Sequence, residues 1–536
     1  MTNVSDIRNI VLLGHGGSGK TSLAESMLHK CGVINRLGSI TDKNTVSDFD
    51  DEEKARGHSI HSALMYLTHA GKLINIIDTP GYPDFIGAAL QSIPAAEIAA
   101  IVINGASGIE INTRKLFAAA TAANRARMII INKMDAENAD LGELVAQIQE
   151  SFGPQCRCVN LPGADKQSII DCLTNTQGES PIMDAASANM ELIERVVEAD
   201  DTLMEAYLSG ETISPEKIKG CFVKAMIAGT VVPILFTDAR KEIGVTELLN
   251  FITSYAPSPA DGPFASLKKP DGTTEIIKPD AAAPLAGIVI RLGFDSRSGM
   301  KYSSIRIFSG SLNAATHLMV NDAKKPLRVG HPLRMQGNEG KEIEAATAGE
   351  MVTLAKLDEL RLGDFIHDGK FEGKIEMPPM PKPMFSLALE PASRNDESKL
   401  GSALEKLAEE DACFKVTRDP QTKELVINGL GDLHLRVMLA KMEHRYKVSV
   451  NTKPPKIPYR ETITGKADGH YRHKKQSGGA GQFGEVYLRV EPAERNSDPS
   501  LVFSWDIFGG AIPGQYEPAI LKGINDVMEC GVVAGF

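Results

Sequence analysis

The sequence lacks the features of a membrane protein and of a disulfide-stabilised or zinc-binding protein. No apolar stretch approaches the roughly 18 residues that a membrane-spanning helix needs. The seven cysteines are odd in number and scattered, and Cys156 and Cys158 form the one close pair, with no second pair or histidine cluster to complete a metal site. These absences predict a globular, cytoplasmic protein with reduced, mostly buried thiols and no contact with a membrane.

Basic residues are also in the minority. The chain has 58 Lys and Arg against 69 Asp and Glu, which gives a net charge of −11. This balance argues against a uniformly basic protein that wraps nucleic acid, although it leaves room for a local basic patch. The sequence also shows no internal repeat and no low-complexity tract. At roughly 150 residues per domain, its length predicts three to four domains.

The N-terminal region contains a phosphate-binding pattern. The apolar run Ile10–Leu13 has the length of a buried strand, and residues 14–21 then fit G-x-x-x-x-G-K-[ST]. In this pattern several backbone N–H groups point at one phosphate, the lysine reaches the outer phosphates and the last hydroxyl binds Mg²⁺. The apolar positions of residues 20–30 predict the helix that follows. The predicted nucleotide-binding residues here are Gly14, His15, Gly16, Gly17, Ser18, Gly19, Lys20, Thr21 and Ser22.

Polar motifs also follow three later apolar strands, predicted over residues 73–77, 128–131 and 231–236. Near-continuous apolar strands that alternate with helices predict a parallel sheet with helices on both faces. Ligands of such sheets bind beyond the carboxyl ends of the strands. The nucleotide site is therefore predicted to include Asp78, Thr79, Pro80, Gly81, Asn132, Lys133, Asp135, Thr237, Asp238 and Ala239.

Asp135 is predicted to read the base. Its carboxylate can accept hydrogen bonds from the ring N–H and the exocyclic amine of guanine, whereas adenine would leave this carboxylate without partners. At the phosphate end, Asp78 would hold Mg²⁺ through a water and the Gly81 N–H would meet the γ-phosphate. The pattern thus predicts GTP or GDP with Mg²⁺, and a P-loop ATPase is a distant alternative.

Changes in composition divide the rest of the chain. Proline-rich linkers begin at Ala256 and at Met377, and the segment between them has short strands with glycine turns. The fold class is therefore multidomain, α/β plus β. We predict a P-loop domain over 1–262 with an inserted subdomain at about 155–228, a β-barrel over 280–376, a small α+β domain over 383–458 and an incomplete domain over 459–536.

These motifs resemble the translational GTPases of the elongation factor G family over the whole chain. Residues 56–60 resemble the first switch of the family, with Ser59 at the position of its Mg²⁺-binding threonine, and residues 78–85 resemble its second switch. Residues 429–435 resemble the third domain, and residues 473–479 resemble the tip loop of the fourth. The resemblance implies a metal set of Thr21, Ser59 and Asp78. It implies RNA contacts by His473, Lys474, Lys475, Gln476, Ser477, Gly478 and Gly479, for which a solvated loop is the alternative.

Three positions depart from the family pattern. Tyr82 stands where the family has its catalytic histidine, Gly17 replaces an acidic residue of the phosphate loop, and Asp238 replaces a serine. The resemblance then implies a divergent subgroup in which Tyr82, Lys20 and Gly81 are the catalytic residues. Of two other conspicuous side chains, His434 is predicted to be structural and Trp505 to lie in a core.

The resemblance implies a monomeric ribosomal factor that hydrolyses GTP and, in its full-length form, promotes movement of tRNA and mRNA, with rRNA and the tRNA–mRNA complex at the decoding site as partners. The alternatives are a GTPase of ribosome recycling, protection or assembly, and a GTP-sensing ribosome-binding protein with little catalysis. Relatives continue past Phe536 with the rest of the fourth domain and a fifth. We therefore expect a fragment whose predicted strands over 486–490 and 501–505 lack some neighbours.

Overall fold

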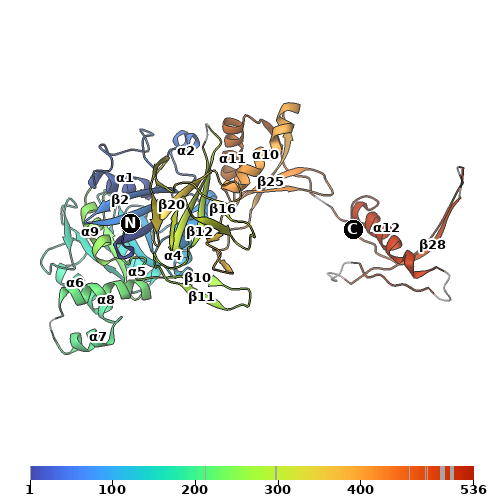
Figure 1. The fold of residues 1–536 in the computed structure, drawn as a ribbon. Helices are drawn as coiled ribbons and strands as arrows, with labels where there is room; N and C mark the ends of the chain where they lie inside the picture. Colours follow the sequence, from blue (N-terminus) through green and yellow to red (C-terminus); the bar gives the residue numbers. More distant parts are fainter. Residues whose placement is uncertain are drawn as a thin grey trace. The chain divides into compact units, whose positions relative to one another are not determined.

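The computed structural model describes residues 2–211, 213–295, 298–457, 459–476, 478–479, 481–494, 501–507 and 512–536 (Figure 1). The chain forms two compact units. The first comprises Met1–Phe385, Pro391–Lys415 and Asn428–Val450, and the second comprises Ser386–Glu390, Val416–Ile427 and Asn451–Phe536. Among the described helices, none combines the length and the apolar character needed to cross a membrane.

The first unit contains a seven-stranded sheet with the order β2-β3-β1-β4-β5-β9-β6. Its strands are β1 (Ile7–Leu13), β2 (Ala63–His69), β3 (Lys72–Asp78), β4 (Ile98–Asn104), β5 (Ala126–Asn132), β6 (Cys156–Cys158) and β9 (Val232–Phe236). The pairs among β3, β1, β4, β5, β9 and β6 are parallel, as the apolar strands predicted. The edge strand β2 is antiparallel to β3, so the sheet is mixed rather than wholly parallel.

Helices cover both faces of this sheet, which confirms that prediction. Alternate residues of β1 point to opposite faces, so Ile10 and Leu12 lie in one hydrophobic core while Val11 and Leu13 lie in the other. The first core is covered by α1 (Lys20–Lys30), α8 (Pro215–Ala228) and α9 (Val245–Tyr255). The second is covered by α3 (Ile86–Ser92), α4 (Ile111–Ala122) and α5 (Leu141–Phe152).

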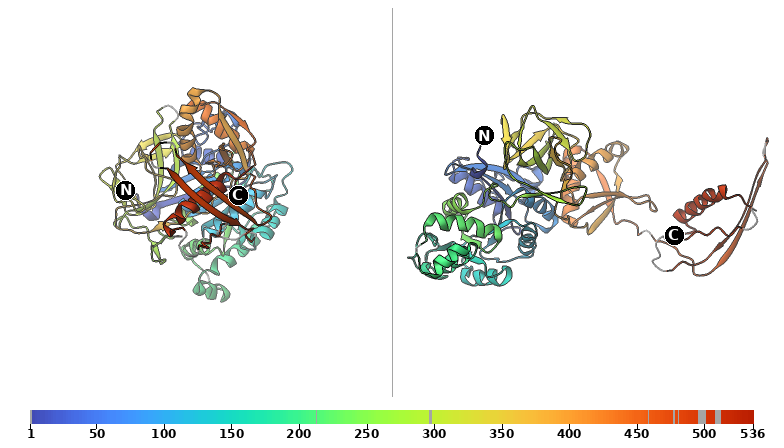
Figure 2. Two further views of the ribbon diagram at one scale, coloured as in Figure 1. Left: turned by 90° about the vertical axis from the view of Figure 1, so that its right-hand side faces the viewer. Right: turned by 60° about the horizontal axis from the view of Figure 1, so that its bottom comes forward.

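The region predicted as an inserted subdomain is mainly helical. It contains α6 (Ala185–Val197) and α7 (Asp201–Leu208) together with α8, and the short antiparallel pair β7 (Asn160–Pro162) and β8 (Ile169–Asp171). These helices gather at one end of the first unit (Figure 2). Asp200 caps α7 by accepting a hydrogen bond from the Leu203 N–H, so α7 begins as a separate helix shortly after α6 ends.

An antiparallel β domain follows, as the glycine turns predicted. Its eight-stranded sheet has the order β16-β15-β21-β12-β13-β20-β17-β18 and encloses a core that includes Val289, Ile305 and Val352. The strands are β12 (Ala286–Phe294), β13 (Lys301–Ser309), β15 (His317–Val320), β16 (Leu327–Arg328), β17 (Leu333–Gln336), β18 (Glu339–Glu342), β20 (Met351–Ala355) and β21 (Phe365–His367). Smaller sheets join β10 (Ala265–Lys268), β11 (Thr274–Ile277) and β22 (Lys374–Ile375), and β14 (Ser311–Asn313) and β19 (Ala345–Thr347).

Buried hydrogen bonds join this β domain to the mixed sheet. Asn9 Nδ2 donates to Glu97 Oε2 at 2.8 Å, and Asn75 Nδ2 donates to Asn9 Oδ1 at 2.7 Å. Glu97 also pairs with Arg306 of β13 at 2.5 Å. Leaving such deeply buried polar groups without hydrogen bonds would be costly. This network therefore favours the single arrangement of the β domain on the mixed sheet in which all these bonds are made.

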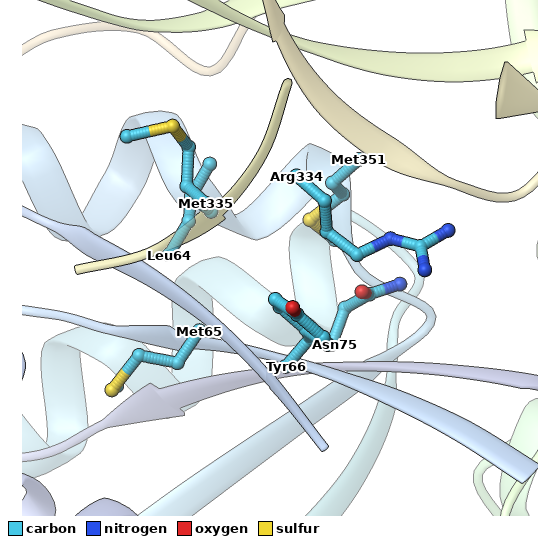
Figure 3. Close-up of a pocket in the computed structure, with 7 residues that line it drawn as sticks. All are labelled: Leu64, Met65, Tyr66, Asn75, Arg334, Met335 and Met351. Carbon is cyan, nitrogen blue, oxygen red and sulfur yellow. The ribbon is translucent and has the colours of Figure 1, made fainter. Parts of the chain in front are cut away.

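A cavity of about 10 Å³ lies beside this network (Figure 3). That volume is close to the minimum for one water molecule and leaves no room for a nucleotide. The Arg334 guanidinium, at the edge of the cavity, lies over the Tyr66 ring at 5.5 Å. The cavity is lined by Leu64, Met65, Tyr66, Asn75, Arg334, Met335 and Met351.

The next region has the strand and helix order that the sequence predicted for an α+β domain. Strands β23 (Phe385–Pro391), β24 (Lys415–Arg418), β25 (Leu425–Gly429) and β26 (Val450–Lys453) form a sheet with the order β24-β25-β23-β26. The helices are α10 (Arg394–Glu410) and α11 (Asp432–Tyr446). On α11, His434 is fully buried, lies 3.2 Å from Asp411 and bonds the Leu430 N–H, which fits the structural role predicted for it.

The second unit contains a long hairpin of β27 (Ala467–Lys475) and β28 (Gln482–Val490), and helix α12 (Glu517–Cys530). The predicted strand over 486–490 is part of β28. The predicted strand over 501–505 is wrong, because residues 501–507 have no regular secondary structure. Trp505 is half-buried rather than in a core, because no described strand or helix contains it.

Candidate nucleotide-binding site

The phosphate loop connects β1 to α1 and bends around the Lys20 ammonium. Gly17 and Gly19 adopt left-handed φ angles of 79° and 94°, which disfavour residues with a side chain. Lys20 Nζ donates to the carbonyl oxygens of Gly14 and His15, both at 2.9 Å. Burial lowers the pKa of Lys20 to about 8. An anion bound here would therefore stabilise the charged ammonium, and the N-terminus of α1 points at the same place.

Hydroxyl and carboxylate oxygens lie close together at the end of the phosphate loop, around Thr21. Thr21 Oγ1 donates to Asp78 Oδ2 at 2.6 Å and lies 3.3 Å from Ser59 Oγ. Ser59 Oγ in turn donates to Asp48 Oδ1 at 2.7 Å. Burial raises the pKa of Asp78 to about 6 and also raises that of Asp48.

The chemistry of these donors fits Mg²⁺, which prefers carboxylate and hydroxyl oxygens. The structure thus brings together the predicted metal residues Thr21, Ser59 and Asp78. The sequence reasoning missed Asp48 as a neighbour of Ser59. Asp48 begins the acidic run that precedes residues 56–60, but its distance from Ser59 along the sequence did not indicate that the two side chains would meet at the metal site.

The second switch packs against the phosphate loop at Gly81. A Cβ atom on Gly81 would lie 2.5 Å from Lys20 Nζ and 2.6 Å from the Gly16 nitrogen, so no larger residue fits. Asn112, at the start of α4, donates through Nδ2 to the Gly81 carbonyl at 2.8 Å and was not predicted. Thr79 Oγ1 donates to the Leu12 carbonyl at 2.6 Å. These bonds hold the Gly81 backbone beside the position predicted for the outer phosphate.

Residues predicted to contact the base are tied directly to the phosphate loop. Asn132 Nδ2 donates to the Ser18 carbonyl at 3.1 Å, while its Oδ1 accepts the Ala239 N–H at 3.0 Å. Lys133 Nζ donates to the Gly17 carbonyl at 2.8 Å. Three strand ends therefore form one rigid surface, as their positions along the sheet predicted.

Asp135 is held as a carboxylate. A hydrogen bond from Asp238 and the Lys241 ammonium at 2.7 Å keep the pKa of Asp135 below its usual range. Burial raises the pKa of Asp238 above its usual range. Asp238, which stands where the family has a serine, therefore contacts Asp135 through a side-chain hydrogen bond.

One pocket of about 260 Å³ connects these groups. Its lining includes the predicted residues Gly16, Gly17, Gly19, Lys20, Thr21, Ser22, Ser59, Thr79, Gly81, Tyr82, Asn132, Lys133 and Ala239. It also includes the unpredicted residues Ile40, Thr41, Gly57, His58 and Arg240. The other predicted residues do not line it, namely Gly14, His15, Ser18, Asp78, Pro80, Asp135, Thr237 and Asp238.

The residues predicted to contact RNA lie at the tip of the β27–β28 hairpin. His473, Lys474 and Lys475 are the last residues of β27, and Gln476, Gly478 and Gly479 follow them. Ser477 lies outside the described residues. Within the described chain, Lys474 and Lys475 form no ion pair, whereas Arg472 lies 3.5 Å from Glu485.

Comparison with known proteins identifies the relatives of this chain. Family models match the Elongation factor Tu GTP binding domain at residues 5–258, Elongation factor G domain 2 at 284–369, Elongation Factor G domain III at 380–454 and Elongation factor G domain IV at 455–536.

A crystal structure of the protein ttk003000868 from Thermus thermophilus is similar along nearly the whole chain. It is 30% identical, with a TM-score of 0.86, and the match covers 99% of this chain and 79% of the Thermus chain. The chain therefore belongs to the elongation factor G-like translational GTPases, which bind guanine nucleotide, hydrolyse GTP and act with the ribosome.

Proposed function

We propose that the protein promotes the movement of tRNA and mRNA through the ribosome, driven by Mg²⁺-dependent GTP hydrolysis. The observation that carries this proposal is the combination of a GTPase domain with a long hairpin whose tip holds the exposed cations Lys474 and Lys475. Exposed cations on a projecting hairpin suit contacts with RNA phosphates at the decoding site. We further propose the domain boundaries 1–262, with an insertion at about 155–228, then 280–376, 383–458 and 459–536.

In the proposed complex the base contacts Asn132 and Asp135, and the phosphates lie in the loop of residues 14–21. Thr21, Ser59 and Asp78 hold Mg²⁺, which would neutralise charge on the phosphates. Lys20, Gly81 and Tyr82 surround the γ-phosphate as the catalytic residues. Loss of that phosphate after hydrolysis removes contacts that order the first and second switches, and this release is how the nucleotide would change the conformation of the factor.

The test uses ribosomes with tRNA in both sites and an mRNA whose position is read by primer extension. In its full-length form the protein with GTP should advance the mRNA by one codon, and a non-hydrolysable analogue should slow turnover of the factor. GTP hydrolysis with separation of the subunits and no mRNA movement would instead indicate recycling. Ribosome binding without stimulated hydrolysis would indicate a GTP sensor, and either result would reject the proposal.

Ser59→Ala tests the metal site. Ser59 reaches Thr21 and Asp48 from the first switch, so we expect its hydroxyl to contact Mg²⁺ when the γ-phosphate is present. The variant should weaken binding of a GTP analogue in Mg²⁺ by at least about tenfold and leave GDP binding unchanged, because losing a polar interaction with a charged group costs about 1.5–3 kcal/mol. Fluorescent-nucleotide titration measures both constants, with Ser39→Ala as the control. Equal losses of affinity for GDP and for the analogue would show that Ser59 does not bind the Mg²⁺ ion.

Substituting both Lys474 and Lys475 by Ala tests the hairpin tip. If both contact phosphates, the slope of log affinity for ribosomes against log salt should fall by about 0.7 for each lost contact. Intrinsic GTP hydrolysis should not change, since the hairpin belongs to the second unit. Lys466→Ala is the matched control, because Lys466 lies near the start of the same hairpin and already pairs with Glu491 at 2.9 Å. An unchanged salt slope would show that the tip does not contact RNA phosphates.

A further inference from the structure

An imidazole lies in the nucleotide pocket where the sequence did not predict one. His58, in the first switch, lines the pocket together with Lys20, Gly81 and Tyr82. Its ring centroid is 4.5 Å from that of Tyr82, with the planes inclined by 39°. The Tyr82 ring occupies space above Gly16, where a Cβ atom would lie 3.1 Å from its Cε2. The absence of a side chain at Gly16 therefore makes room for this aromatic pair over the phosphate loop.

Contacts with the surrounding chain fix the position of His58. Gly57, with φ of 70°, ends α2 (Asp51–Arg56) and turns the chain toward the pocket. Glu53 Oε1 accepts the N–H groups of Ile60 and His61 at 2.9 and 3.0 Å, which restrains the backbone just after His58. On the side away from the pocket, the buried Phe85 ring lies 5.9 Å from the imidazole.

The place of His58 in the chain puts it at the phosphate end of the pocket. It directly precedes Ser59, whose hydroxyl lies 3.3 Å from that of Thr21. The Gly81 backbone and the Lys20 ammonium face the same region. An attacking water bound beside the γ-phosphate would therefore lie between the first and second switches, within reach of groups from both.

The chemistry of the lining side chains favours the imidazole for holding that water. Lys20 is a donor only, and its ammonium is directed at the phosphate loop. The Tyr82 hydroxyl can donate one hydrogen bond, but its oxygen is a weaker acceptor than an imidazole nitrogen because its lone pair is delocalised into the ring. A neutral imidazole offers one donor and one acceptor, so it can accept a hydrogen bond from water and direct a lone pair of the water oxygen at phosphorus.

We propose that His58 is a catalytic residue of GTP hydrolysis, whose imidazole orients the attacking water while the Tyr82 ring holds the imidazole in place. The water oxygen forms a bond to the γ-phosphorus as the bond from that phosphorus to the bridging oxygen of GDP breaks. One water proton leaves on inorganic phosphate and the other passes to solvent, so His58 gains no net proton. The proposal rests on the nucleotide placement given above, in which the γ-phosphate lies beside Lys20 and Gly81.

The test is single-turnover GTP hydrolysis on ribosomes by His58→Ala, His58→Gln and Tyr82→Phe, each also titrated with fluorescent GDP and a GTP analogue. His58→Ala should slow hydrolysis by about 100-fold, the cost of a misplaced reactant, and leave both affinities within about threefold. His58→Gln should recover part of the rate, because its amide also donates and accepts. Tyr82→Phe should retain most of the rate, because the proposed role needs the ring and not the hydroxyl. His69→Ala, in β2, is the control for loss of a histidine outside the pocket.

Three results would overturn the proposal. The first is a His58→Ala rate within about threefold of the parent protein. The second is a loss of analogue affinity in proportion to the rate, which would make His58 a structural part of the first switch. The third is loss of most of the rate in Tyr82→Phe alone, which would show that the Tyr82 hydroxyl, and not His58, orients the attacking water. If the parent protein itself fails to bind nucleotide at this pocket, the nucleotide placement fails instead, and the GDP titration reveals that separately.

Discussion

Asp135→Asn is expected to change the preference of the pocket from guanine to xanthine nucleotides, with a change of about 10⁴-fold in the ratio of their affinities. The carboxylate of Asp135 accepts two hydrogen bonds from guanine. An asparagine amide presents an N–H₂ group to the exocyclic amine of guanine, so one bond is lost and two donors face each other. Xanthine carries a carbonyl oxygen at that position, which accepts a hydrogen bond from the amide.

The substitution should leave the fold intact. Asp135 pairs with Lys241 at 2.7 Å, but the Lys241 side chain is 48% exposed, and ion pairs this open contribute less than about 1 kcal/mol. Displacement of a fluorescent nucleotide by GDP and by xanthosine diphosphate measures both affinities. Glu137→Gln, an exposed carboxylate close by in the sequence, is the control and should keep the preference for guanine. Equal GDP affinity in Asp135→Asn and the parent protein would show that Asp135 does not read the base.

Local sequence patterns predicted the sheet and the groups at its edge because both depend on short-range rules. The apolar run at Ile10–Leu13 and the glycines of residues 14–21 specify a strand, a loop and a helix start without help from the rest of the chain. Since parallel strands end at one edge, Asp78 and Asn132 had to approach that loop. The structure has these residues in contact, through the Thr21–Asp78 and Asn132–Ser18 hydrogen bonds.

Contacts between residues far apart in the sequence could not be predicted from such local patterns. Asp48, His58 and Asn112 reach the site from loops and from a helix start, and no periodicity marks them. Their positions depend on packing against elements that are distant in the sequence. The edge strand β2 was missed because it belongs to a largely polar stretch, although Ala63, Leu64, Met65 and Leu67 of this strand are buried. The strand predicted at 501–505 is the opposite case, a predicted strand that the structure lacks. Its apolar residues alone did not specify pairing with a neighbouring strand.

The clearest long-range contact joins the first switch region to α11. Asp50, the N-cap of α2, accepts the Glu52 N–H at 2.9 Å through Oδ1. Its Oδ2 accepts a hydrogen bond from Arg445 of α11, which also donates to Glu410 of α10 at 2.9 Å. The side chains of Asp50 and Glu410 are nearly fully buried. Arg445 thus neutralises two buried carboxylates and anchors the helix that leads to His58 and Ser59.

Arg445→Ala should therefore release α2. The variant leaves Glu410 buried without its ion-pair partner and leaves Asp50 with the Lys441 ammonium at 3.7 Å. Removing one partner from a buried ion pair costs about 3–5 kcal/mol. If that cost is met by local opening, amide exchange across residues 51–56 should become about 10³-fold faster, while β1 and β3 keep their protection. Affinity for the GTP analogue should fall when α2 opens, since Ser59 lies just after α2 in the chain. GDP affinity should change little. Hydrogen exchange and nucleotide titration on the same sample measure both effects.

Two variants separate this explanation from a general loss of stability. His444→Ala removes the neighbouring contact of α11 with Glu52, but the His444 side chain is 64% exposed, so it should cost less than about 1 kcal/mol and leave exchange in α2 nearly unchanged. Adding Glu410→Gln to Arg445→Ala removes the buried carboxylate that lost its ion pair and should restore part of the protection. If exchange rises equally across the mixed sheet, or if His444→Ala has the same effect as Arg445→Ala, then Arg445 is not a specific anchor of the first switch.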